Sequence, residues 1–301
     1  MDREEIELER QNVFVHGNNI KQKMDNHPKY SDEISRAYLN EISAYYKTWK
    51  QRNQDLRGPF KISSAEDATI LSQRVQLFID YKNFIDQQHY AEKFDSRSNL
   101  HSSVLEEFIY YLFRDLLLDF EGIPLVGKSH AFKDMFFAPK NFQEMVHAPS
   151  LRIEQKDHDF VIGISIDAQF QCNGSDIVER SEFEVPAVAI ECKTYLDKTM
   201  LEASSAAAEQ LKYKNPNSKY ILVMEWLKLS DSINLKKYKV DQIYVFRKQK
   251  NTDREFRYDD AYDKKPIDPA VIGHLFNMVR EHLTSDWSGD VSEGLERGWL
   301  I

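Results

Sequence analysis

The stretch VPAVAIECK, residues 185–193, decides the fold. Its apolar, partly β-branched run is typical of a buried β-strand. Because side chains alternate along a strand, Glu191 and Lys193 share one face, whereas Ile190 and Cys192 point to the other. A carboxylate and an ammonium are costly to bury unless they are paired or metal-bound. The pair is therefore either an ordinary ion pair at a sheet edge or part of a functional site.

A second stretch, QKDHDFVIG at residues 155–163, supplies another carboxylate. Asp159 directly precedes the apolar run of this predicted strand. If the two strands are neighbours, Asp159 comes close to Glu191. Two carboxylates and nearby carbonyls form a hard-oxygen site suited to Mg²⁺. A lysine beside them can orient or deprotonate a water and offset charge on a phosphate. Asp157 would face the same side of the strand, so alternation does not separate it from Asp159.

The chain changes character near residue 150. Apolar residues at helical spacing predict helices at about 32–53, 63–90 and 102–120, and a final helix after residues 266–269. Strand-like stretches lie near 159–170, 184–193, 219–227 and 241–247, with a small-residue helix at 201–211 that we expect to lie close against a sheet. This order predicts an α/β fold with a mixed central sheet flanked by helices and a mostly helical N-terminal region.

The composition excludes several classes of protein. The 301 residues carry 49 acidic and 40 basic side chains, and the net charge of −9 argues against unspecific coating of nucleic acid. No apolar stretch approaches the roughly 18 residues of a membrane span, and the charged start MDREEIELER does not resemble a signal peptide. The two cysteines, Cys172 and Cys192, predict no disulfide framework and fit a reducing cytoplasm. Basic segments at 235–239 and 247–250 are candidates for phosphate contacts or simply solvated faces.

Residues 122–129, GIPLVGKS, formally match the phosphate-binding pattern G-x-x-x-x-G-K-[ST]. That motif requires a strand before the loop and a helix after it. Here the preceding residues have a helical pattern, the following ones lack a helical stripe, and Pro124 has no N–H to donate. We therefore expect an ordinary loop and no nucleotide cofactor.

The two acidic strands and the small-residue helix resemble the PD-(D/E)xK nuclease superfamily, and within it the type II restriction endonucleases of the BbvCI-like group. The resemblance covers about residues 102–247. It implies a restriction-endonuclease-like core in a nuclease domain at 101–301, preceded by a helical region at 1–100 for DNA recognition or dimerisation. The implied activity is Mg²⁺-dependent hydrolysis of double-stranded DNA at a short specific sequence in the prokaryotic cytoplasm. Because one active site cuts one strand, a homodimer or heterodimer is expected.

Two alternatives to this activity remain open. The first is a repair or structure-specific nuclease with the same core. The second is a non-catalytic DNA-binding protein on the same fold.

The resemblance also implies individual roles. Asp159 and Glu191 would bind the metal, the backbone carbonyl of Cys192 would add a ligand, and Lys193 would position the attacking water. Members often carry a further glutamate on the first helix of the core, and Glu106 fits its spacing better than the next residue, Glu107. A solvent-facing charge is the plainer interpretation of either glutamate.

The sequence departs from the family pattern in two ways. The residue before Asp159 is His158 and not proline, which keeps Asp157 as a competing first acid. The gap between Asp159 and Glu191 is long, and predicts a long hairpin with residues 173–175 at its tip.

Overall fold

The computed structural model describes residues 13–94, 99–251, 259, 261–287 and 291–298. Within these ranges no helix is long and apolar enough to cross a membrane.

The centre of the molecule is a mixed five-stranded sheet with the strand order β1-β2-β3-β4-β5. The strands are β1 (Leu125–Phe137), β2 (Leu151–Gln171), β3 (Val178–Leu196), β4 (Lys219–Leu227) and β5 (Gln242–Val245). β2 is antiparallel to β1 and β3, whereas β3, β4 and β5 run parallel. The parallel step from β3 to β4 requires a crossover, which is the helix α8 (Lys198–Lys214). The predicted α/β fold with a mixed sheet is confirmed.

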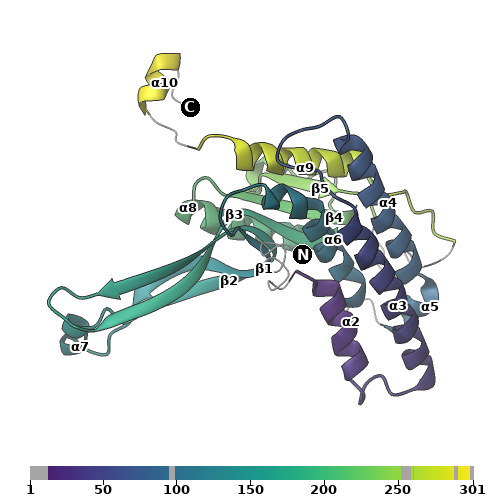
Figure 1. The fold of residues 1–301 in the computed structure, drawn as a ribbon, viewed down its shortest axis with the longest axis horizontal. Coiled ribbons are helices and arrows are strands. Elements are labelled where there is room, and N and C mark those ends of the chain that lie inside the picture. The colour runs from purple at the N-terminus through teal and green to yellow at the C-terminus, as the bar shows by residue number, and fades with distance from the viewer. Residues whose placement is uncertain (1–12, 95–98, 252–258, 260, 288–290, 299–301) are drawn as a thin grey trace.

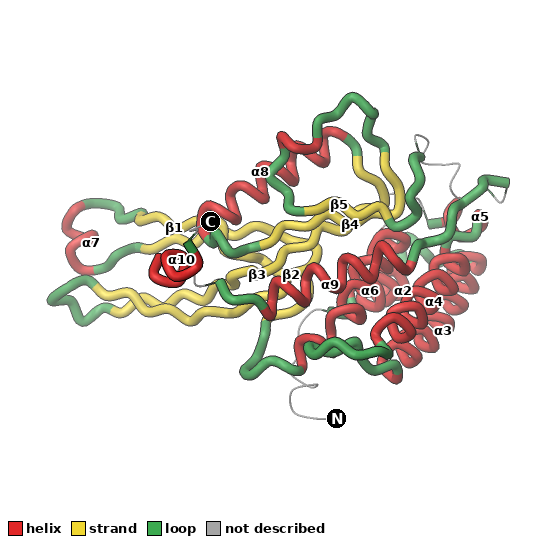
Figure 2. The backbone as a smooth tube through the Cα atoms, turned by 90° about the horizontal axis from the view of Figure 1, so that it is seen from above, coloured by secondary structure: helices red, strands yellow, loops and turns green. Residues whose placement is uncertain are grey.

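Helices cover both faces of the sheet and create two hydrophobic cores (Figure 2). One face packs against α6 (Asn99–Leu118) and α9 (Pro269–Thr284), and the other packs against α8. The alternation of β3 follows this division, since Ile190 and Cys192 join the α6 side and Ala189 joins the α8 side. The small residues Ala207 and Ala208 are buried between α8 and the sheet, as their size predicts.

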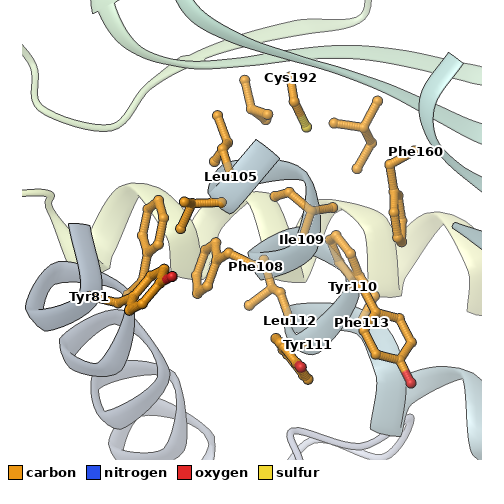
Figure 3. Close-up of a cluster of buried hydrophobic side chains, with 14 of the residues drawn as sticks. Tyr81, Leu105, Phe108, Ile109, Tyr110, Tyr111, Leu112, Phe113, Phe160 and Cys192 are labelled. Atoms are coloured by element: carbon orange, nitrogen blue, oxygen red, sulfur yellow. The ribbon is translucent and has the colours of Figure 1, made fainter. Parts of the chain in front are cut away.

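The N-terminal helices pack around α6, which is buried along most of its length (Figure 3). They are α2 (Val15–Asp25), α3 (Glu33–Asp55), α4 (Asp67–Ile85) and the short α5 (Gln88–Lys93). Phe78 of α4 stacks on Phe108 of α6 with ring centroids 4.3 Å apart, and Trp49 of α3 stacks on Tyr81 at 4.8 Å. These helices therefore share one continuous hydrophobic core with the sheet-facing side of α6.

A group of buried charges also joins the helices to the sheet. The ammonium of Lys82 on α4 lies 3.0 Å from Glu225 on β4 and 2.9 Å from Asp86. Arg247 pairs with the other side of Glu225 at 3.1 Å, and His101 at the start of α6 contacts Asp86. Each carboxylate in this group thus has a cationic neighbour, which the burial of the charges requires.

An arm built from the far ends of β1, β2 and β3 projects from this body (Figure 1). β2 is 21 residues long, and both of its ends lie in the arm because the strand bends near Gly163. A side chain at Gly163 would collide with the Val185 carbonyl, so glycine permits the close approach there. The helix α7 (Phe142–His147) and the turn at residues 172–177 form the tip. The predicted long hairpin with residues 173–175 at its tip is confirmed.

The expectation of a loop at residues 122–129 is wrong for most of the segment, because Leu125 to Ser129 belong to β1. The phosphate-binding pattern therefore continues into a strand and is not followed by a helix. β1 escapes detection in the sequence because its pairing with β2 contains two register shifts, which interrupt the alternation of buried and exposed side chains. The short helix α10 (Val291–Arg297) follows α9.

Candidate active site

Asp159 and Glu191 come together because β2 and β3 pair antiparallel. The β2–β3 ladder ends at the pair Phe160 and Ile190. The next residue beyond this pair is acidic on both strands, Asp159 on β2 and Glu191 on β3. The backbone N–H of Cys192 donates to Asp159 Oδ2 at 2.9 Å. This bond joins the two strands where both carry their acidic side chains.

Lys193 links both carboxylates. Its Nζ lies 2.7 Å from Asp159 Oδ2 and 2.9 Å from Glu191 Oε2. Glu191 and Lys193 lie on β3, an inner strand of the sheet. The expectation that their ion pair lies at a sheet edge is therefore wrong. Sequence reasoning correctly expected Asp159, Glu191 and Lys193 to be brought together.

The other oxygen of Glu191 is held by two further side chains. Tyr220, near the start of β4, donates its hydroxyl to Glu191 Oε1 at 2.9 Å. His158 Nδ1 lies 3.3 Å from the same oxygen, and the His158 and Tyr220 rings meet edge to face with centroids 5.7 Å apart. Both oxygens of Glu191 are thus oriented, one towards Lys193 and one towards these rings. Neither His158 nor Tyr220 was predicted, and only the position of His158 beside Asp159 could have suggested it.

The ionisable groups of the cluster differ in the direction of their pKa shifts. Burial alone would raise the pKa of Glu191, but hydrogen bonds from His158 and Lys193 hold it well below its usual range. Burial and the neighbouring charge of Glu191 raise the pKa of Asp159 despite the opposing effect of Lys193. Burial would lower the pKa of Lys193, yet the two carboxylates raise it above its ordinary value. Lys193 is therefore a protonated, cationic group in this arrangement.

Glu106 adds a third carboxylate from α6. Its Oε2 is buried and has no hydrogen-bond partner in the described part of the chain. Burial, followed by the negative charge of Asp159, raises the pKa of Glu106 to about 7, while Lys128 of β1 and Lys193 oppose this rise. An unpartnered buried carboxylate oxygen beside a second carboxylate is a feature that a cation would relieve. Lys128, the lysine of the phosphate-binding pattern, thus lies on this side of the sheet.

The expectation that the helix glutamates face solvent is wrong for both. Glu107 is fully buried and accepts hydrogen bonds from the backbone N–H groups of His16 and Gly17 and from the hydroxyls of Tyr46 and Tyr111. Glu107 therefore connects α6 to α2 and α3, while Glu106 belongs to the carboxylate cluster.

Asp157 lies apart from the cluster although it is only two residues from Asp159. Its exposed side chain pairs with His130 on β1. The register of β1 and β2 shifts here, so that Asp159 and Phe160 lie together opposite Lys128. Such a bulge changes the direction of the following side chains. The strand thereby directs Asp159, and not Asp157, towards Glu191.

Tyr220 offers a direct test of how Glu191 is held. For the nuclease activity that the sequence resemblance implies, we predict that Tyr220→Phe lowers the turnover number at least about 10-fold, since one hydrogen bond to a charged group contributes roughly 1.5–3 kcal/mol, while KM for DNA is unchanged. Steady-state cleavage of a short duplex measures both constants. Tyr244→Phe, which removes a hydroxyl bound to His274 instead, is the matched control. An unchanged turnover number in Tyr220→Phe would contradict this role.

Comparison with known proteins places the chain among nucleases. The model of a family described as Bpu10I restriction endonuclease matches residues 97–300. A solved structure of native BbvCI, described as an A2B2 tetramer at low resolution, shares the fold with a TM-score of 0.64 and 20% sequence identity, covering 90% of this chain and 96% of that one. No curated protein is a significant match in sequence.

Proposed function

Because this chain belongs to the Bpu10I restriction endonuclease family, we propose that it is a type II enzyme that hydrolyses double-stranded DNA at a short specific sequence with Mg²⁺. The sequence-based resemblance to restriction endonucleases is confirmed by that membership and by the shared fold with BbvCI. The observation that carries the proposal is the contact of Lys193 with both Asp159 and Glu191. Carboxylates beside a cationic lysine suit attack of water on a phosphodiester.

We propose that a magnesium ion binds at this cluster. Asp159 and Glu191 offer hard carboxylate oxygens, and we assign the backbone carbonyl of Cys192 as a further ligand. The buried Oε2 of Glu106, which lacks a partner in the described residues, supports a fourth contribution from α6. A bound Mg²⁺ would supply positive charge against the scissile phosphate.

The protein's own groups act around that charge. Lys193 contacts both carboxylates, which raise its pKa above its ordinary value. We assign it to position the attacking water and to offset negative charge on the phosphate. His158 and Tyr220 contact Glu191 Oε1 and keep the side chain in one orientation. The other oxygen, Oε2, then faces Lys193.

The proposed partners are DNA and further protein chains. Lys236, Lys237, Lys239 and Lys248 are exposed near β5 and are suited to contact phosphates. One cluster of Asp159, Glu191 and Lys193 cuts one strand, so cutting both requires two chains or two engagements. The BbvCI tetramer is one such assembly for that protein. We propose an oligomer for this chain as well, acting in the cytoplasm, with the helices before α6 serving DNA recognition or assembly.

Digestion of unmethylated plasmid and phage DNA by the purified full-length chain tests the proposal. We expect discrete, reproducible bands in Mg²⁺ and none in EDTA. A continuous smear would indicate a repair or structure-specific nuclease instead. Retarded but uncut DNA in a gel-shift assay would indicate a non-catalytic DNA-binding protein.

A further inference from the structure

The arm, defined as residues 130–157 and 164–184, projects from the body of the molecule. Phe132 and Phe183 pack inside it with ring centroids 5.1 Å apart. At the tip, Ser175 Oγ donates to the His147 carbonyl at 2.6 Å, which fastens the turn to α7. Strand pairing extends to Phe137 on β1 and to Gln171 on β2. The arm therefore places its tip away from the body (Figures 1 and 2).

Large apolar side chains are exposed at the tip. Phe142 on α7 is 79% exposed, and Phe137 at the end of β1 is 57% exposed. Met145 and Val146 on α7 and Ile177 in the turn are each about half exposed. We call these five residues the tip patch. Exposed apolar patches of this kind mark interaction surfaces.

A complementary apolar groove lies at the foot of the arm. Its volume is about 470 Å³, and it is lined chiefly by Phe120, Ile123, Ile162, Ile164, Leu283 and Trp287. Ile123 and Ile164 are 64% and 53% exposed. We call this the base groove. Gln171 at the far end of β2 lies seven residue steps beyond Ile164, which is roughly 23 Å at the usual rise. A chain therefore cannot place its own tip patch in its own base groove.

We propose that a second copy of this chain docks with its arm antiparallel to the first, so that each tip patch enters the partner's base groove. A two-fold axis makes every such contact twice. The surface is adequate, because buried aromatic side chains contribute about 150–250 Å² each. Tip patch and groove supply part of the roughly 800 Å² per partner that a standard interface buries. The inference rests on the proposed function, because cutting both strands of DNA requires two catalytic centres and two chains supply them.

Charge favours a protein partner over DNA. Lys140 beside the tip patch and Glu121 beside the base groove are both exposed and opposite in sign, so the antiparallel arrangement pairs them. The arm carries nine acidic and five basic side chains. A net negative arm repels the phosphate backbone.

Sedimentation velocity of the full-length chain, without DNA or Mg²⁺, tests the interface. We expect a dimer for the wild type. Phe142→Ser combined with Met145→Ser should weaken self-association roughly 100-fold, as should Ile164→Glu in the groove. Ile62→Ser, at a residue 82% exposed outside the arm, is the control and should remain dimeric. A monomeric wild type, or tip variants that dimerise normally, would overturn the proposal.

Disulfide cross-linking then tests which surfaces meet in the dimer. In a Cys172→Ser background, chains with Met145→Cys are mixed with chains with Ile123→Cys under mild air oxidation. We expect a covalent dimer of the two different variants and none from either alone. Self-linking of Met145→Cys would show tip-to-tip contact and overturn the antiparallel model. Tip variants that lose DNA affinity but still dimerise would make the tip a DNA contact. Neither measurement depends on cleavage, so its outcome is separate from that of the nuclease assay.

Discussion

We expect Lys193→Ala to abolish detectable DNA cleavage, a loss of roughly 10³-fold or more, and Glu191→Gln to do the same. Lys193 is the group that touches both carboxylates, at 2.7 and 2.9 Å. Removing it takes away the cation expected to hold the attacking water and leaves two carboxylates without their shared partner. Glu191→Gln keeps the size of the side chain but removes its negative charge. The measurement is the rate of conversion of supercoiled plasmid in Mg²⁺, with thermal unfolding to confirm that each variant is folded.

A nearby lysine outside the cluster controls for surface charge. Lys198 at the start of α8 is 68% exposed and lies 3.7 Å from Glu202. Lys198→Ala should cleave DNA at close to the wild-type rate. If a folded Lys193→Ala or Glu191→Gln variant cleaved at the wild-type rate, the catalytic assignment would be wrong.

We expect Lys82→Met to lower the free energy of unfolding by about 3–5 kcal/mol, because it removes the ammonium partner of the buried Asp86 and leaves the buried Glu225 with Arg247 alone. The Lys82 side chain is 1% exposed and contacts Asp86 and Glu225, whose side chains are 7% and 2% exposed. The variant also breaks a connection between α4 and the central sheet. Urea unfolding followed by circular dichroism measures the change.

The matched control is Lys93→Met, which breaks an exposed pair with Asp32. Exposed ion pairs contribute about 0–1 kcal/mol, so this variant should be nearly as stable as the wild type. Equal stability of Lys82→Met and Lys93→Met would refute the structural importance of the buried group.

The parts of the fold with strong periodicity could be predicted from the sequence. The helices at α3, α4, α6 and α9 have apolar residues at helical spacing, and β4 is a continuous apolar run. The strand β1 could not be predicted, because its register shifts break the period of two. The arm was visible only as an unusually long gap between Asp159 and Glu191.

The candidate site also has parts that the sequence predicts and parts that it does not. Glu191 and Lys193 belong to one strand, and local alternation alone places them on one face. Choosing Asp159 over Asp157 depends on a bulge, which arises from pairing with another strand. Tyr220 and Glu106 reach the cluster from β4 and α6, and their approach depends on how distant segments pack.

The class of fold, the acidic strands and the charged groups on them thus follow from the amino-acid sequence. These features depend on the order of side chains within one segment. The packing of distant segments, in contrast, buries Glu107 among tyrosines, brings Glu106 to the carboxylates, and holds the apolar tip of the arm away from the body. Burial and hydrogen bonding depend on which segments meet in space, and neighbours in sequence do not specify that meeting.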